Sequence, residues 1–300
     1  MGLGIIPQNK ALFLLFLIPY HNTMTSSLSS SPMLSVRLMQ GSIFKYIFAA
    51  FKDLVNEISF DWEPTDSKRM TLQGMCSSHI SLVRVSIEQD AFSEYRCDRA
   101  YSTGVNIDSL NKILKTCGPD DTMEIKSKID KADNIDFMFK HPQRSKQANF
   151  SLKLMDIDAE YLDVRPEFSC VITMPPDLLE CIIKQINVFG ASLRITANSK
   201  EVVFETLDGD MASAKHIIQA GTPQTEDDPD TCKIKCEEDT ESSIVLATSY
   251  IVKFIKATDL KCPTVKIKIN HETYFALEYA VDRLYNVFFF MAGKEPVVDV

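Results

Sequence analysis

The sequence lacks the short motifs that mark the common classes of enzyme. It contains no G-x-x-x-x-G-K-[ST] phosphate loop, no G-x-G-x-x-G after a strand and no H-E-x-x-H zinc motif. The five histidines are scattered, so no pairing of a nucleophile with a base is suggested. These absences favour a protein that binds other macromolecules over an enzyme, and they predict no cofactor.

Cysteine pairs with metal-ligand spacing are also missing. Of eight cysteines none form C-x-x-C, and the close pair Cys232 and Cys236 has no second Cys or His pair nearby to complete a zinc site. We therefore expect free thiols in a reducing compartment. Asp156 and Asp158 would point the same way in a strand, but their segment is typical of a solvated linker. We predict no metal site.

Positive charge is in deficit, because 41 acidic residues against 32 basic ones give a net charge of −9. That balance argues against a protein that grips DNA over an open basic face. The acidic residues, however, cluster in Glu226–Asp230 and Glu237–Glu241, away from the predicted helices. Exposed helices ordinarily carry lysine, yet this separation favours one positive surface on an acidic protein. The lysines on predicted helices are Lys45, Lys52, Lys112, Lys115, Lys184, Lys253 and Lys256.

The N-terminal segment differs from the rest of the chain. The apolar run Ala11–Pro19 is too short to span a bilayer as a helix, and no small-residue cleavage site follows it cleanly. Residues 23–32 are rich in Ser and Thr. We predict that residues 1–32 are a disordered or leader extension outside the fold, and that the protein does not associate with membranes.

Hydrophobic periodicity predicts two halves with the same order of elements. Helices are expected at Ser42–Glu57, with Ser42 as N-cap, and at Asp108–Cys117, Pro175–Val188 and Ala247–Thr258. Alternating strands lie between and after them. The pattern Lys-apolar-apolar-Lys recurs at Lys112–Lys115 and Lys253–Lys256. We expect an N-terminal domain at 33–154, a linker at 155–168, a C-terminal domain at 169–294 and a tail at 295–300.

Several runs resemble the proliferating cell nuclear antigen family, the eukaryotic DNA sliding clamps. The most specific are Leu72-Gln-Gly-Met-Cys-Ser-Ser-His-Ile-Ser-Leu82, Tyr95-Arg-Cys-Asp-Arg99 and Leu152-Lys-Leu-Met-Asp-Ile-Asp158. The C-terminal half is similar more loosely, through runs such as Phe254-Ile-Lys-Ala-Thr258. The resemblance covers residues 33–294.

The resemblance implies an α+β fold, the DNA clamp (processivity) fold, with two similar domains per chain. Three subunits would form a ring-shaped homotrimer with helices inside and sheets outside. Lysines on the helices would face the phosphates of double-stranded DNA without reading its sequence. The DNA-facing residues would be Lys45, Lys52, Lys112, Lys115, Lys184 and Lys256.

The resemblance also implies partners. The chain would act as a processivity factor in replication and repair, tethering DNA polymerases and other proteins with a clamp-binding motif. A separate ATP-driven clamp loader would open the ring, and the protein would act in the nucleus. The partner groove would consist of Met75, His79, Ile80, Leu82, Leu162, Val164, Tyr274, Phe290, Met291 and Ala292.

Some positions depart from the family pattern. Cys76 stands where the family usually has Asp, Gly293 replaces a Pro after the groove-forming strand, and the linker is about one residue short. Two alternatives stay open. These departures give weight to a diverged paralogue of the clamp. The other alternative is a subunit of a checkpoint-type heterotrimeric clamp, which shares the fold.

Overall fold

The computed structural model describes residues 33–67, 69–129, 133–157, 167–209, 212–221, 231–237, 240–271, 273–281 and 284–294. The predicted extension 1–32, most of the predicted linker and the tail 295–300 therefore lie outside the described residues. No helix among the described residues is long and apolar enough to cross a membrane.

The first half consists of two helices and a series of strands. In chain order its elements are β1 (Met33–Leu38), α1 (Gly41–Phe51), β2 (Glu57–Trp62), β3 (Met70–Met75), β4 (Ser81–Ile87), the 3-10 helix η2 (Gln89–Ala91), β5 (Phe92–Cys97), β6 (Tyr101–Asn106), α2 (Ile107–Leu114), β7 (Thr122–Lys128), β8 (Asn134–Lys140) and β9 (Gln147–Lys153).

The second half repeats this order. Its elements are β10 (Cys170–Met174), α3 (Pro176–Phe189), β11 (Ser192–Ala197), β12 (Glu201–Thr206), β13 (Lys215–Gln219), β14 (Lys233–Cys236), β15 (Ser242–Ala247), α4 (Thr248–Phe254), the 3-10 helix η4 (Ile255–Leu260), β16 (Val265–Asn270), β17 (Tyr274–Val281) and β18 (Tyr285–Ala292). The predicted internal repeat is confirmed, strand for strand and helix for helix.

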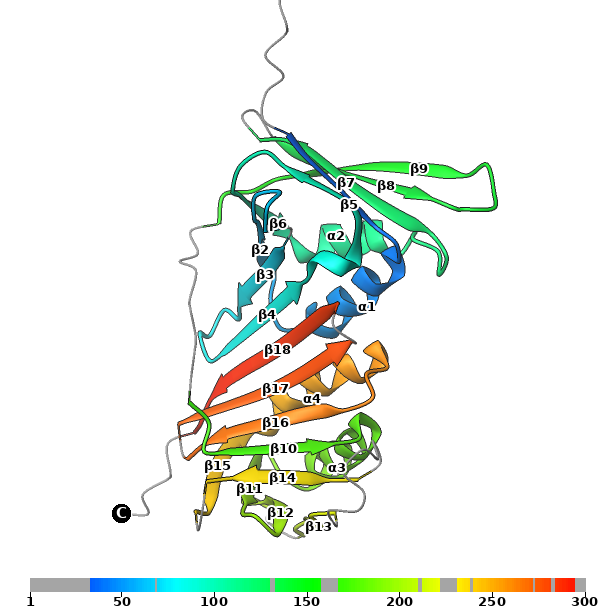
Figure 1. Ribbon diagram of the computed structural model, residues 1–300. Coiled ribbons are helices and arrows are strands. Elements are labelled where there is room, and N and C mark those ends of the chain that lie inside the picture. Colours follow the sequence, from blue (N-terminus) through cyan, green and yellow to red (C-terminus); the bar gives the residue numbers. More distant parts are fainter. Residues whose placement is uncertain are drawn as a thin grey trace, which may run out of the picture. The chain divides into compact units, whose positions relative to one another are not determined.

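The strands form three antiparallel sheets. Nine strands run as one sheet in the order β14-β10-β16-β17-β18-β4-β3-β2-β6, which Figure 1 shows continuing from one half into the other. The two halves meet where β18 pairs with β4, from Tyr285 opposite Ile87 to Met291 opposite Ser81. The smaller sheets have the orders β5-β1-β7-β8-β9 and β13-β12-β11-β15. This is the predicted α+β fold.

Helix ends differ from the predicted ones. The first helix ends at Phe51 instead of Glu57, because Glu57 already pairs with Asn106 in the β2–β6 ladder. Ser42 is not its N-cap; the cap is Gln40, and the Ser42 hydroxyl donates to the carbonyl of Pro119. The fourth helix divides into α4 and η4, and the C-cap of η4 is Lys261, which has a left-handed φ of 55°.

One expectation about cysteine is wrong. Cys170 and Cys236 face each other in the β10–β14 ladder, with Cα atoms 4.0 Å apart, and form a disulfide. The pairing depends on strand register across 66 residues of sequence, which no local spacing indicates. The other six cysteines form no disulfide within the described residues, and Cys181 is the exposed one among them.

Candidate functional site

The helices of the two halves form one continuous layer. α1 packs on α2 and on η4, and η4 and α4 pack on α3. Each helix contributes one buried apolar stripe, such as Phe44, Ile47 and Phe48 of α1. The opposite sides carry the exposed lysines together with some exposed apolar residues, such as Val188 of α3. We call α1, α2, α3, α4 and η4 together the helix layer.

The six candidate DNA-facing lysines all belong to the helix layer. Lys45 is half-buried on α1, and Lys52 is exposed as its C-cap. Lys112 lies in the last turn of α2, and Lys115 is the C-cap of this helix. Both positive charges therefore interact favourably with the negative end of the helix dipole. Lys184 is exposed on α3 and Lys256 on η4. The packing of the helices therefore brings the six residues into one layer.

Two of these lysines are held by carboxylates of the same layer. The Lys256 ammonium donates to the Asp53 carboxylate, so this ion pair joins η4 to the end of α1. The hydrogen bond from Lys256, with the charges of Lys52 and Lys253, lowers the pKa of Asp53. Lys184 pairs with Glu180 one turn earlier, Nζ to Oε1 2.6 Å, and this hydrogen bond raises the pKa of Lys184. Separation of charge by element is thus partial.

Lys253 lies in the last turn of α4, as its repeat partner Lys112 does in α2, and it contacts an aromatic ring. Its ammonium lies 5.6 Å from the centroid of the Tyr250 ring, a cation–π contact within α4. The Tyr250 hydroxyl is 2.6 Å from the hydroxyl of Ser78, in the turn between β3 and β4. Lys253 is therefore engaged toward this turn.

Part of the predicted partner groove forms one row across three strands. Met75 of β3 lies opposite Leu82 of β4, which lies opposite Phe290 of β18, so the three side chains share one face of the sheet. Beside this row, Tyr274 lies opposite Ala292, and the amide of Ala292 donates to the carbonyl of Ile80. Ile80 is 41% exposed and Tyr274 50% exposed, so apolar surface is open to solvent here.

Met291 does not belong to that surface. It alternates with Phe290 along β18 and is 3% exposed in the core on the opposite face of the sheet. Leu82 lies on the groove face but is only 5% exposed. Leu162 and Val164, the two predicted groove residues of the linker, lie outside the described residues.

The turn before β4 is held by unusual interactions. His79 has a left-handed φ of 57°, and its amide donates to the carbonyl of Cys76. The Cys76 sulfur lies 3.2 Å from the amide of Ser81 and 3.2 Å from the hydroxyl of Ser78. Burial by itself raises the pKa of the Cys76 thiol. These hydrogen bonds lower the pKa by more than burial raises it, so the pKa falls to about 7. The Cys76 sulfur thus accepts a hydrogen bond from the amide of Ser81.

Sequence reasoning missed two sheet edges. β9 ends the five-stranded sheet and β13 ends the four-stranded sheet, so each has one side without a partner strand among the described residues. β13 carries Ile217, which is 51% exposed. An open edge with exposed apolar residues is a template for pairing with another chain. The signal in the sequence was the apolar pair Ile217–Ile218 in an otherwise polar strand.

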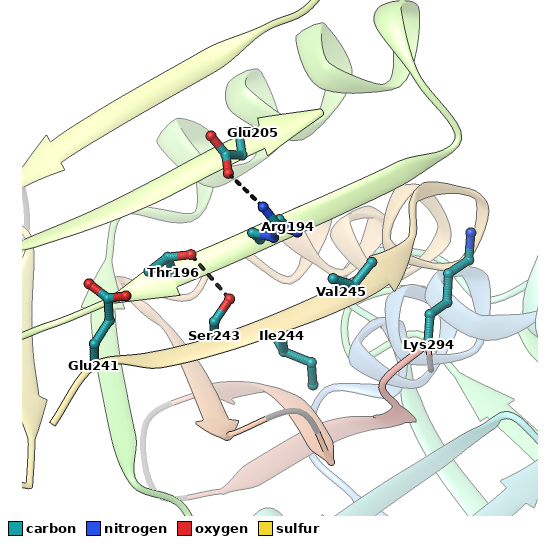
Figure 2. A pocket seen from close by; sticks show the side chains of 8 residues that line it. All are labelled: Arg194, Thr196, Glu205, Glu241, Ser243, Ile244, Val245 and Lys294. Carbon is teal, nitrogen blue, oxygen red and sulfur yellow. Dashed lines mark hydrogen bonds and ion pairs between the residues drawn. The ribbon is translucent and has the colours of Figure 1, made fainter. Parts of the chain in front are cut away.

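A polar cleft lies on the four-stranded sheet (Figure 2), but its side chains largely satisfy one another. Arg194 reaches Glu205 at 3.4 Å and Thr196 reaches Ser243 at 3.2 Å. Lys294 at its rim donates to the hydroxyl of Ser192 at 2.7 Å. No nucleophile–base pair lines the cleft, and no group of three or more metal-ligating side chains occurs in the part of the chain that the structure describes.

Comparisons with known proteins agree with this architecture. Residues 33–161 match the family model of the proliferating cell nuclear antigen N-terminal domain, and residues 164–294 match that of the C-terminal domain. The chain is also similar to the proliferating cell nuclear antigen of Dictyostelium discoideum. The two are 32% identical over 264 residues, which cover 87% of this chain and 99% of the relative.

Proposed function

The chain belongs to the proliferating cell nuclear antigen family and is a DNA sliding clamp, and on that premise we propose that three copies close into a ring with the helix layer toward DNA. It is a processivity factor for replication and repair, and we assign it no catalytic step. We further propose that an ATP-driven clamp loader opens the ring, and that the protein acts in the nucleus.

The pairing of β18 with β4 is the observation that carries the ring proposal. β18 is the last strand of its half, and β4 is the third strand after the first helix of its half. The equivalent strands by order are β9 and β13, and each of them is a terminal strand of its sheet among the described residues. Pairing β9 of one subunit with β13 of the next would repeat the β18–β4 seam between chains. Such head-to-tail contacts generate a ring when the rotation closes.

In that ring the six lysines of the helix layer would contact phosphates. Their contacts carry no base specificity, which suits movement along any sequence. Lys184 and Lys256 are already paired with Glu180 and Asp53, so part of their charge is balanced before DNA arrives. A moderate electrostatic grip leaves retention to enclosure and permits sliding.

Topology provides the direct test of this function. The protein is loaded onto nicked circular DNA with a clamp loader and ATP, and the loader is then removed by gel filtration at moderate salt. We expect the clamp to stay on the circle and to leave once a restriction enzyme linearises it. Equal retention on circular and linear DNA would refute enclosure.

Oligomeric state separates the homotrimer from the heterotrimeric alternative. Light scattering on the purified chain should give three times the mass of 33.9 kDa. A checkpoint-type subunit, which needs different partners, should not trimerise alone. A persistent monomer at micromolar concentration would therefore favour that alternative.

The partner groove comprises Met75, His79, Ile80, Leu82, Tyr274, Phe290 and Ala292, together with Leu162 and Val164. A clamp-binding peptide with apolar and aromatic anchors would fill this groove. Its anchors would supply most of the binding energy. Combining Leu162→Ala with Val164→Ala should weaken the binding of a labelled clamp-binding peptide by on the order of 2 kcal/mol. The trimer should be unchanged. Equal affinity of both proteins would move the partner site elsewhere.

A further inference from the structure

A second feature adjoins the partner groove on the same face of the nine-stranded sheet. Cross-strand pairs place Lys235, Val171, Lys268, Ala276 and Phe290 in one row, which ends at the groove residues Leu82 and Met75. The next row contains Lys233, Thr173, Lys266, Glu278, Phe288 and Arg84. The alternate residues of these strands, such as Ile172, Ile267 and Phe289, are buried in the core.

These rows concentrate positive charge on an acidic protein. We call Lys233, Lys235, Lys266 and Lys268 the lysine quartet. Among the described residues of β14, β10, β16, β17 and β18, Glu278 is the one acidic side chain on this face. It pairs with Lys268 at 2.7 Å and Lys266 at 3.6 Å. Lys233 and Lys235 have no acidic partner within the described residues, so the quartet keeps a net positive charge.

An aromatic ladder links the quartet to the groove. The rings of Phe288 and Phe290 stack with centroids 5.8 Å apart. Lys268 lies 5.6 Å from the Phe288 centroid, and Arg84 lies 5.8 Å from the Phe290 centroid. Each ring of the stack thus has a cation within cation–π distance of its centroid. The ladder fixes the spacing between the quartet and the apolar row of the groove.

We propose that the lysine quartet binds an acidic segment that flanks the docking motif of a protein partner. This inference rests on the proposed groove, whose Phe290 lies in the same row as Lys268 and Lys235. The anchors of the partner occupy the groove, and its carboxylates lie over Lys233, Lys235 and Lys266. Neighbouring strands are about 4.8 Å apart, so a short extended segment covers the distance across β18, β17, β16 and β10.

A single-stranded nucleic acid is the competing ligand for a face with lysines and aromatic rings. Such binding depends on bases stacking on free ring faces. Here Phe288 and Phe290 stack on each other, and each ring also has a cation over it, Lys268 over Phe288 and Arg84 over Phe290. These contacts already engage the rings, and the positive charge of the quartet favours carboxylates of a peptide.

The first experiment uses three fluorescent peptides: a plain clamp-binding motif, the motif with Asp/Glu-rich flanks, and the same motif with Asn/Gln flanks. At low salt the wild-type full-length protein should bind the acidic-flank peptide about five- to tenfold more tightly than the neutral one. The advantage should vanish in Lys233→Glu/Lys235→Glu and shrink as salt rises. The control variant is Lys128→Glu/Lys146→Glu, which makes the same charge change at two exposed positions outside the quartet. It should preserve the tighter binding of the acidic-flank peptide.

The peptides distinguish the two proposals. If the plain motif fails to bind, the groove is wrong. If the plain motif binds and acidic flanks add nothing, the lysine quartet is not a docking surface. A poly-dT oligonucleotide serves as a third probe. Two results together would assign the face to nucleic acid. The oligonucleotide would bind the wild-type protein but not Lys233→Glu/Lys235→Glu, and peptides with acidic and neutral flanks would bind equally well.

A second measurement does not depend on the groove. An Asp/Glu-rich peptide without anchors is coupled to the wild-type protein with a carbodiimide, which joins a carboxylate to a lysine amine in contact with it. Mass spectrometry should find the amide bonds concentrated on Lys233, Lys235 and Lys266. Cross-links no more frequent there than on Lys128 and Lys146 would overturn the inference.

Discussion

The two halves of the chain share one order of elements but close their sheets differently. In the second half the last strand, β18, is covered by β4, whereas in the first half the last strand, β9, has an open side. β18 carries Phe288, Phe289 and Phe290, while β9 carries Asn149, Phe150 and Ser151 at the equivalent stage. The same topology thus serves once as an internal seam and once as an open edge, which we propose pairs with another subunit.

A second contrast lies at the start of each half. Cys170 of β10 faces Cys236 of β14 and is bonded to it. The equivalent first-half strands, β1 and β5, place Leu34 opposite Cys97. One half therefore has a covalent link between its first and fifth strands, and the other has a leucine–thiol contact in the core.

The largest effect should come from breaking that link. Cys236→Ala opens a loop closed across 66 residues, which by loop-closure entropy should lower the free energy of unfolding by about 4 kcal/mol. Urea denaturation with and without reductant tests it. Reductant should destabilise the wild-type protein and leave Cys236→Ala unchanged. Cys97→Ala, at the matching first-half position, should keep the response to reductant; a wild-type protein indifferent to reductant would contradict the prediction.

The next largest effect concerns the open edges. Ile217→Asp puts a charge into the proposed β13–β9 contact and should cost about 2 kcal/mol per interface, about 30-fold in the dissociation constant. Sedimentation velocity should then show monomers at concentrations where the wild-type protein is trimeric. Val188→Asp, at a residue 77% exposed on α3, is the control and should remain trimeric. Two proteins with the same sedimentation profile would exclude β13 from the interface.

A smaller effect is expected from the helix layer, where both halves contribute lysines. Replacing Lys52, Lys115 and Lys256 by Glu should reduce DNA retention about tenfold at moderate salt. The dependence of affinity on salt should also flatten, because fewer counterions are released. Retention on nicked circles is the measurement, and the trimer should persist. Unchanged retention would show that another surface faces the DNA.

The smallest effect concerns the ion pair between the halves. Lys256 lowers the pKa of Asp53, so the folded state binds fewer protons than the unfolded state near the ordinary Asp pKa of 3.8. The contribution is therefore present above that pH and is lost as pH falls through the lowered pKa. Both side chains are more than two-fifths exposed, so it should stay below about 1 kcal/mol. In thermal melts, Asp53→Asn should lower the free energy of unfolding by this amount at pH 7 and leave it unchanged at pH 2. An equal loss at both pH values would show that the side chain stabilises the fold by packing and not by its charge.

Much of the fold could be predicted from the sequence because periodicity is local. The alternation of Val83, Val85 and Ile87 and the helical spacing of Phe44, Ile47 and Phe48 each specify a buried face. Contacts between distant segments could not be predicted. The Cys170–Cys236 bond and the Lys256–Asp53 pair depend on tertiary register. Met291 was assigned to the groove by resemblance, although strand alternation places it in the core opposite Phe290.

The β18–β4 seam also limits where a ring can open. In a ring of three such chains, half of the seams between neighbouring domains are inside a chain, and only the seams between chains can separate completely. If one of those parts, the remaining strand pairs still hold the domains in a single open arc. Reclosure then joins two ends of the same assembly, so its rate does not depend on protein concentration. Duplication of the fold within one chain thereby halves the number of seams at which the ring can open. It also makes the closing of each such seam a first-order process.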